Sequence, residues 1–292
     1  MEQKDFWIFD YQPTFDNLIF PEEYYINLKK FVADKQIDNH IIIYGGNGYG
    51  KKTLVKCVIY YCYGIQFSSL VTHNEFTNVK YLDRIYLINL DIYNNNNIYQ
   101  LIDNLAKKTR FDQNVKILII NNLDRLSKLN QIKLSYLMEK KYKNFRLIGL
   151  SSKINQINVK ISKQCYNHRM ASINSNKFKK TLVKLGKNRN VKFTDFQLQK
   201  AKSIYKNNRY NLKKSLLMIQ HMLESKSRDA IPINIKLIHK LLNYTCGSGY
   251  INLQNAKDYI FILIGLGINV SEIVKMCITE IIKNKNLESD KK

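Results

Sequence analysis

The chain has 292 residues, which suits two or three domains, and its 47 Lys and Arg against 23 Asp and Glu give a formal net charge of +24. Hydrophobic residues make up 45% of the chain, which excludes a disordered basic tail, and only three prolines and eleven glycines exclude collagen-like and linker proteins. The balance favours a polyanionic partner such as a nucleic acid, although the Asn, Lys, Ile and Tyr bias of an AT-rich genome explains part of the lysine excess.

The first half of the chain alternates short apolar runs with helical periodicity. The apolar runs predict strands over residues 41–44, 84–90, 115–120 and 145–150, and the periodic segments predict helices over residues 51–63, 98–108 and 127–141. Strands that alternate with helices imply a parallel sheet covered on both faces. We therefore expect an α/β domain over residues 1–170.

The strand signals stop near residue 172, and the second half is predicted to be helical. Residues 176–185 are basic and amphipathic, Thr194 and Gln197 form a capping-box pattern, and Asn211 can cap a third helix. A proline and a charge cluster predict a linker over residues 226–234. We expect a three-helix domain over residues 171–228 and a short helical domain over residues 229–292.

Neither a metal site nor a membrane segment is predicted. The five cysteines form no CxxC pair and the five histidines form no HExxH pattern. The most apolar stretch, residues 259–270, is too short to span a bilayer, so we expect it to be a core helix. The first residues lack the pattern of a signal peptide.

A glycine-rich loop directly follows the first predicted strand and opens the first long helix, which is the context that a phosphate-binding loop requires. Its glycines let backbone N–H groups converge on phosphate oxygens, and the helix N-terminus favours an anion. We predict a site for ATP or ADP formed by Gly45, Gly46, Asn47, Gly48, Tyr49, Gly50, Lys51, Lys52 and Thr53.

The last part of this loop departs from the strict pattern. Lys52 occupies the position where a Ser or Thr hydroxyl normally binds Mg²⁺, and an ammonium group repels a cation. Thr53 follows one residue later, about 100° around the helix. The sequence thus predicts that nucleotide binding at this loop depends only weakly on magnesium.

The end of the third predicted strand lacks the acidic pair that hydrolysis needs. Asn121 and Asn122 stand where one carboxylate would hold Mg²⁺ and the next would polarise the attacking water. Asp124 is the nearest carboxylate, two places further on. We expect a nucleotide pocket with little or no hydrolytic power and assign no catalytic residue.

Several segments resemble, in order, the motifs of the small subunits of replication factor C, the eukaryotic-type DNA clamp loader of the AAA+ ATPases. The segments are Trp7–Pro13 (WIFDYQP), His40–Thr53 (HIIIYGGNGYGKKT), Leu126–Ile148 and Asn211–Leu216 (NLKKSL). The resemblance covers about residues 7–225. It implies a RecA-like parallel-sheet AAA+ domain, a three-helix lid and a short all-α collar domain.

The GKKT ending, with Leu90–Tyr93 and Gln100, is similar to the family branch whose ATPase is least needed. The resemblance implies that Tyr11 and Lys213 contact nucleotide, that Ser152 is the first sensor, and that Lys128 and Lys133 face DNA. Gln164 occupies the place of the arginine finger and carries no charge.

By this resemblance the chain is expected to join other clamp-loader subunits in a hetero-pentamer that loads a PCNA-type sliding clamp on primer-template DNA during replication. The expected location is the nucleus, or a viral replication compartment if the source is a large DNA virus. Two alternatives stay open: an active AAA+ ATPase such as a helicase loader or origin-binding protein, and a nucleic-acid-binding protein that has lost nucleotide.

Overall fold

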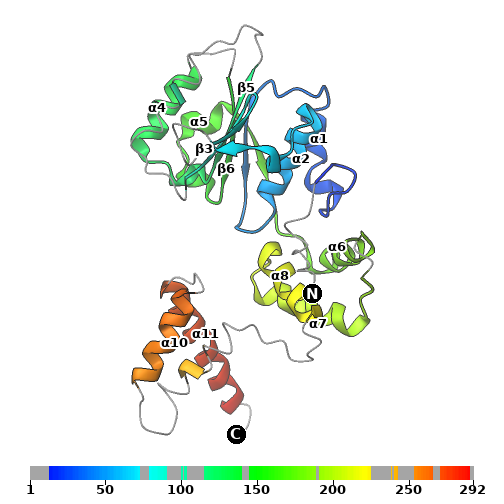
Figure 1. The fold of residues 1–292 in the computed structure, drawn as a ribbon, viewed down its shortest axis with the longest axis vertical. Coiled ribbons are helices and arrows are strands. Elements are labelled where there is room, and N and C mark those ends of the chain that lie inside the picture. The colour runs from blue at the N-terminus through cyan, green and yellow to red at the C-terminus, as the bar shows by residue number, and fades with distance from the viewer. Residues whose placement is uncertain are drawn as a thin grey trace. The chain divides into compact units, whose positions relative to one another are not determined.

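The structure is a computed structural model that describes residues 13–72, 79–90, 100, 102–103, 115–139, 145–188, 191–224, 238, 240–242, 253–265 and 270–289. The chain separates into two compact units, residues 1–220 and 221–292. The first unit contains a sheet with its flanking helices and a group of three further helices (Figure 1).

The sheet has seven strands in the order β2-β3-β4-β5-β6-β1-β7. The strands are β1 (His40–Tyr44), β2 (Val71–Thr72), β3 (Val79–Leu82), β4 (Ile85–Asn89), β5 (Lys116–Asn121), β6 (Phe145–Ser151) and β7 (Cys165–Arg169). Pairing is parallel from β4 through β5, β6 and β1 to β7, and antiparallel at the β2-β3-β4 edge. In the parallel part, Tyr44 pairs with Ser151 and Asn89 pairs with Asn121, so the carboxyl ends of four strands meet at one edge.

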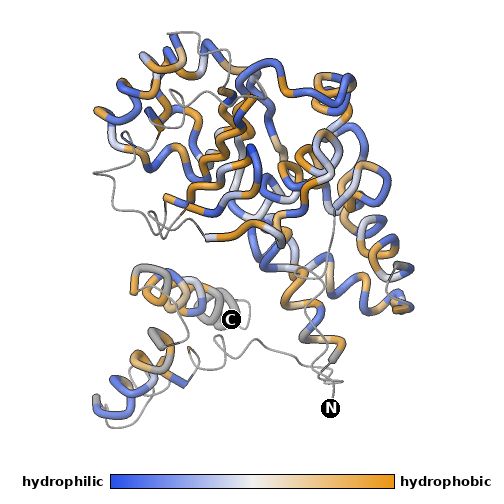
Figure 2. Tube along the Cα trace, turned by 45° about the horizontal axis from the view of Figure 1, so that its top comes forward, coloured by the Kyte–Doolittle hydropathy of each residue, from blue (hydrophilic) through white to orange (hydrophobic). Residues whose placement is uncertain are grey.

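Helices cover both faces of this sheet. Figure 1 shows α1 (Ile26–Phe31) and α2 (Lys51–Tyr63) on one side, and α4 (Lys128–Glu139) and α5 (Val159–Lys163) on the other. The central strands are hydrophobic along their length (Figure 2). Strand residues such as Ile120 and Leu147 pack with Leu134 and Leu137 of α4 and Ile161 of α5 in one buried cluster. Because the central strands are buried on both faces, their sequences are continuous apolar runs.

A buried glutamine joins α4 to the segment that precedes α5. Gln131 is 3% exposed. Its Nε2 donates hydrogen bonds to the carbonyl oxygens of Leu126 (2.9 Å) and Gln156 (3.1 Å), and its Oε1 accepts one from the backbone N–H of Asn158 (2.6 Å). The amide therefore pairs with three backbone groups, of which the Leu126 carbonyl is buried. The short helices η4 (Leu123–Arg125) and η5 (Ile154–Gln156) lie on either side of it in the chain.

The group of three helices comprises α6 (Ser175–Asn188), α7 (Asp195–Asn207) and α8 (Leu212–Glu224). The predicted capping box is present at α7, where Thr194 Oγ1 accepts from the Gln197 N–H and Gln197 Oε1 accepts from the Thr194 N–H. Asn211 caps α8, because its Oδ1 accepts from the Lys214 N–H (3.0 Å). The rings of Phe178 and Tyr205 stack between α6 and α7 with centroids 3.9 Å apart.

The second unit contains α10 (Leu253–Gly265) and α11 (Val270–Ser289). Leu263 of α10 and Ile273 of α11 are buried in its core. A second line of apolar side chains along α11 is exposed: Val270, Val274, Ile278, Ile281 and Ile282. Among the described residues, no helix is both long enough and apolar enough to cross a bilayer.

The predicted strands and long helices of the α/β part are confirmed wherever they lie in described residues, but three features were wrong or missed. The sheet is mixed rather than parallel throughout, because β2 and β3 run antiparallel. The short β7 was not predicted, because its sequence CYNHR is polar and only its pairing with β1 makes it a strand. The predicted core helix over residues 259–270 is confirmed only in part: residues 259–265 are helical and Leu263 is buried, but α10 ends at Gly265, Val270 belongs to α11, and Phe261 is exposed.

Two predicted segments lie wholly or mostly outside the described residues. The predicted linker over residues 226–234 is outside them. Of the predicted helix over residues 98–108, the structure describes residues 100, 102 and 103, which are helical.

Candidate nucleotide site

The phosphate loop lies between β1 and α2, at the sheet edge where the parallel strands end. Lys51, the first residue of α2, is half-buried, and its Nζ donates hydrogen bonds to the carbonyl oxygens of Gly45 (2.7 Å) and Gly46 (3.0 Å). Burial lowers the pKa of Lys51, and the nearby Asp124 carboxylate opposes that shift. The lysine is thus held across the mouth of the loop, where its ammonium group can exchange loop carbonyls for phosphate oxygens.

The three-helix group contacts the tip of the loop directly. The backbone N–H of Lys213 donates a hydrogen bond to the carbonyl oxygen of Gly48 (3.3 Å). A Cβ at Gly48 would lie 1.9 Å from Asn211 Oδ1, and the φ of +77° at this glycine is one that other residues rarely adopt. A side chain at position 48 would therefore require the Asn211 amide to move and would strain the backbone of the loop.

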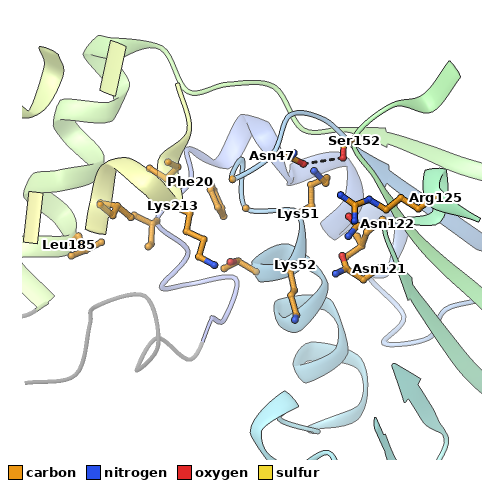
Figure 3. Close-up of a pocket in the computed structure, with 17 residues that line it drawn as sticks. Phe20, Asn47, Lys51, Lys52, Asn121, Asn122, Arg125, Ser152, Leu185 and Lys213 are labelled. Atoms are coloured by element: carbon orange, nitrogen blue, oxygen red, sulfur yellow. Dashed lines mark hydrogen bonds between the residues drawn. The ribbon is translucent and has the colours of Figure 1, made fainter. Parts of the chain in front are cut away.

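The end of β6 contacts the same loop from the sheet side. Ser152 Oγ donates a hydrogen bond to Asn47 Oδ1 (3.0 Å), shown dashed in Figure 3. The Ser152 N–H donates to Asp124 Oδ1 (3.3 Å), so this carboxylate is already engaged with backbone. Ser152, Asn47 and Asp124 thus link the ends of β6 and β5 to the phosphate loop.

The two asparagines at the end of β5 adopt different conformations. Asn121 is the last residue of the strand, and its Nδ2 donates to Asn89 Oδ1 on β4 (3.0 Å). Asn122 has a left-handed backbone (φ 58°, ψ 48°), which asparagine tolerates better than most residues. Both amides are half-buried at the same sheet edge as the phosphate loop.

These elements enclose a cavity of about 420 Å³, large enough for a nucleotide. Its wall combines apolar side chains from the N-terminal segment and the three-helix group with polar and cationic side chains from the loop and the strand ends (Figure 3). The lining residues are Ile19, Phe20, Asn47, Gly48, Gly50, Lys51, Lys52, Thr53, Asn121, Asn122, Arg125, Leu150, Ser152, Leu185, Leu212, Lys213 and Leu216.

The structure brings most of the sequence-predicted residues to this cavity. Thr53 lines it despite its displacement by one residue from the usual hydroxyl position. Gly45, Gly46 and Tyr49 belong to the loop but are not among the lining residues, and the Tyr49 ring packs against Gly46. Tyr11 lies outside the described residues. Whether these residues bind nucleotide stays a prediction.

Three other predicted residues lie away from the cavity wall. Lys128 and Lys133 are on α4 and do not line the cavity; Lys128 is exposed and Lys133 is half-buried. Gln164 is the C-cap of α5 and is half-buried immediately before β7.

Sequence reasoning missed several lining residues. Phe20, Leu185, Leu212 and Leu216 supply much of the apolar wall. The helical spacing of the three leucines in α6 and α8 predicted only packing, and Phe20 precedes the first helix. Arg125 follows the asparagine pair by three residues and was not singled out. Its position directly after a strand end was the available signal.

The donor set suits a nucleotide better than a magnesium ion. A base can lie against the apolar wall and phosphates can lie along the loop and lysines, as in other helix-terminal anion sites. Magnesium prefers carboxylate and hydroxyl oxygens. No carboxylate lines the cavity within the described part of the chain, and no group of three or more His, Cys, Asp and Glu residues is found there.

Comparisons with known proteins place the chain beside DNA-replication proteins. No protein-family model matches. The chain is 25% identical to replication factor C subunit 3 of Arabidopsis thaliana over 235 residues, which cover 73% of this chain and 65% of the plant protein. It is 27% identical to replication factor C subunit 5 of Saccharomyces cerevisiae over 265 residues, 80% of this chain and 74% of the yeast protein. A replication factor C small subunit of Acanthamoeba polyphaga mimivirus is 21% identical over 94% of this chain and 75% of its own length.

Solved structures support the fold. The Holliday junction branch migration motor RuvB of Thermotoga maritima superposes with a TM-score of 0.54 at 14% identity, covering 92% of this chain and 91% of RuvB. The chain spans slightly less than two thirds of the Arabidopsis subunit. The sheet with its phosphate loop and three-helix lid is the AAA+ fold, and the chain is related in sequence to the small subunits of replication factor C.

Proposed function

We propose that this chain is a subunit of a replication factor C-like clamp loader, which helps to load a PCNA-type sliding clamp onto primer-template DNA during DNA replication. In this role it binds ATP or ADP and hydrolyses it poorly, while other subunits carry out most of the hydrolysis. The proposal is supported by the related replication factor C subunits and by the AAA+ fold.

The observation that carries the proposal is the combination of a phosphate loop that keeps its glycines and Lys51 with two amides at the neighbouring strand end. Lys51 and the loop glycines keep the frame that holds phosphates. Asn121 and Asn122 replace the carboxylates that would bind metal and polarise water. An amide is neither a general base nor a strong ligand for Mg²⁺, so binding is retained and cleavage is not.

Association with other subunits is supported by the second unit. The exposed apolar line on α11 runs from Val270 to Ile282, next to the side that carries the buried Ile273. Apolar surface of this extent is typical of protein interfaces. In a hetero-pentamer this helix would pack against the equivalent part of a neighbouring subunit.

DNA contact is proposed for the α4 surface. Lys128 and Lys133 would meet backbone phosphates, which makes binding independent of sequence and sensitive to salt. The location that follows is the nucleus, or a viral replication compartment. The related mimivirus protein supports the second option.

Single-turnover hydrolysis of radiolabelled ATP by the full chain tests the proposal. We expect slow or undetectable phosphate release together with measurable binding of ATP and ADP. The control is Lys51→Ala, which should reduce binding without changing the background rate of release. A rapid rate that Lys51→Ala abolishes would show that the site is an active ATPase.

Native mass spectrometry separates the proposal from a self-contained AAA+ ATPase such as a helicase loader. Mixing the chain with other clamp-loader subunits of the same source should give a hetero-pentamer with one copy of the chain. A homo-hexamer formed by the chain alone would favour the alternative.

A further inference from the structure

Most apolar side chains of the cavity wall come from the lid and the N-terminal segment, although Lys213 also lies on the lid side, and this gives a bound nucleotide a direction. Leu185, Leu212 and Leu216 form an apolar wall on the lid side. Asn122, Arg125 and Ser152 lie at the sheet side, and Figure 3 shows Leu185 and these three residues on opposite sides of the loop. A base is expected at the apolar end, so the terminal phosphate is expected at the end that contains Arg125.

Magnesium does not fit at that end. The metal would need carboxylate ligands at the positions of Asn121 and Asn122, and Lys52 adds a positive charge where a hydroxyl ligand would stand. The nearby acid, Asp124, accepts a hydrogen bond from the Ser152 N–H and does not line the cavity. Binding of a triphosphate here therefore requires another source of positive charge.

Cationic side chains from three separate elements line the cavity instead. Lys51 and Lys52 begin α2, Lys213 is the second residue of α8, and Arg125 ends η4. In the view of Figure 3 the guanidinium group of Arg125 points from η4 toward Lys51. A guanidinium group is always charged and presents a planar fork that matches two phosphate oxygens.

We propose that Arg125 binds the terminal phosphate of a nucleoside triphosphate in place of Mg²⁺, so that the site prefers the metal-free triphosphate and uses Arg125 to distinguish it from the diphosphate. This inference rests on the proposed nucleotide binding and extends it to the form of the ligand. Metal-bound triphosphate binds less well, because the ion neutralises the charge that the cationic side chains recognise and is itself repelled by Lys52.

The test is isothermal titration calorimetry of the full chain with ATP and with ADP, each in excess EDTA and in excess Mg²⁺. We expect ATP to bind more tightly than ADP in EDTA, and Mg²⁺ to weaken ATP binding. Arg125→Ala should lower the affinity for metal-free ATP by about tenfold or more and leave the affinity for ADP nearly unchanged. Arg125→Lys should recover part of the loss, because it restores charge without the planar fork.

Arg84→Ala is the charge-matched control, since Arg84 pairs with Asp83 and does not line the cavity. Thermal melting of each variant checks the fold. Unchanged ATP-to-ADP discrimination in Arg125→Ala, or tighter ATP binding in Mg²⁺, overturns the role of Arg125 and leaves nucleotide binding intact. Absence of binding by the unaltered chain in both conditions overturns the proposed nucleotide function as well.

Discussion

The backbone N–H of Lys213 donates a hydrogen bond to the carbonyl oxygen of Gly48, which joins the lid to the tip of the phosphate loop. Gly48 has a φ of +77° and lies against the side chain of Asn211 at the start of the lid helix α8. In Gly48→Ala the new Cβ would lie 1.9 Å from Asn211 Oδ1. We expect this variant to bind nucleotide more weakly and to melt at a lower temperature than a matched glycine variant.

The matched control is Gly64→Ala. Gly64 also has a left-handed backbone (φ +66°), but a Cβ there meets nothing within 4 Å. Backbone strain alone should cost each variant about 1–2 kcal/mol in the free energy of unfolding. Denaturant melts and nucleotide titrations of both variants separate that strain from the contact with Asn211. Equal losses in the two variants would argue against a tight lid contact.

Restoring the missing acids should not restore hydrolysis by itself. In the variant Asn121→Asp with Asn122→Glu, Lys52 still repels the metal that the new carboxylates would hold. Addition of Lys52→Thr should be needed before Mg²⁺-dependent phosphate release rises above background. Single-turnover assays of the double and triple variants, with and without Mg²⁺, measure this, and activity in the double variant would show that Lys52 is not an obstacle.

The stability of the fold should fall as the pH is lowered from about 6.5 toward 4. Burial, with a smaller effect of Arg146, lowers the pKa of His40 to about 4, and His40 Nδ1 accepts a hydrogen bond from the Leu147 N–H (2.9 Å). In this interval the unfolded chain binds a proton that the folded chain does not, so acid favours unfolding by at most about 1.4 kcal/mol per pH unit. The variant His40→Gln, measured by urea melts across this range, should show a flatter profile than the unaltered chain.

The capping box of α7 predicts a measurable loss of stability in Thr194→Ala. The Thr194 hydroxyl oxygen accepts from the Gln197 N–H, and its removal should cost about 1 kcal/mol in the free energy of unfolding. Ser203→Ala, on the exposed surface of the same helix, is the control and should change stability much less. Thermal melts of the two variants compare them directly.

If Lys128 and Lys133 contact DNA phosphates, we expect DNA binding to be sensitive to salt. Replacement of both by Ala should weaken binding equally for unrelated primer-template sequences and reduce the dependence of log K on log salt by about two. The same double replacement at Lys180 and Lys187 of α6 is the comparison. A larger effect in the α6 variant would indicate that DNA contacts the three-helix lid rather than α4.

The strands of the sheet and the phosphate loop could be predicted because their signals are local. Continuous apolar runs identified β1, β4, β5 and β6, and the glycines after β1 identified the loop. The polar β7 and the two-residue β2 depend on pairing with distant strands, so no local pattern indicated them. In the second unit the prediction failed at a helix boundary. One apolar run was interpreted as a single core helix, although it spans the end of α10 and the start of α11.

The residues of the candidate site also fall into two groups, those with a local sequence signal and those without one. Loop residues and the asparagine pair were recognisable from short motifs, whereas the apolar wall and Arg125 are brought to the cavity by tertiary packing. Leu185 and Leu216 lie on separate lid helices, and periodicity indicated only that they are buried. Arg125 lies one residue beyond Asp124, the last residue of the strand-end motif. The short helix η4 brings it to the cavity wall.

The buried Gln131 has a mechanical consequence. Its amide forms hydrogen bonds to two segments of the backbone: to Leu126, which directly follows η4, and to Gln156 and Asn158, which precede α5. Loss of the amide would leave the buried Leu126 carbonyl without this donor, which is costly away from water. The amide thus holds the segment that follows η4 beside the segment that leads to α5, so a single buried side chain fixes the position of two stretches of backbone that are distant in the sequence.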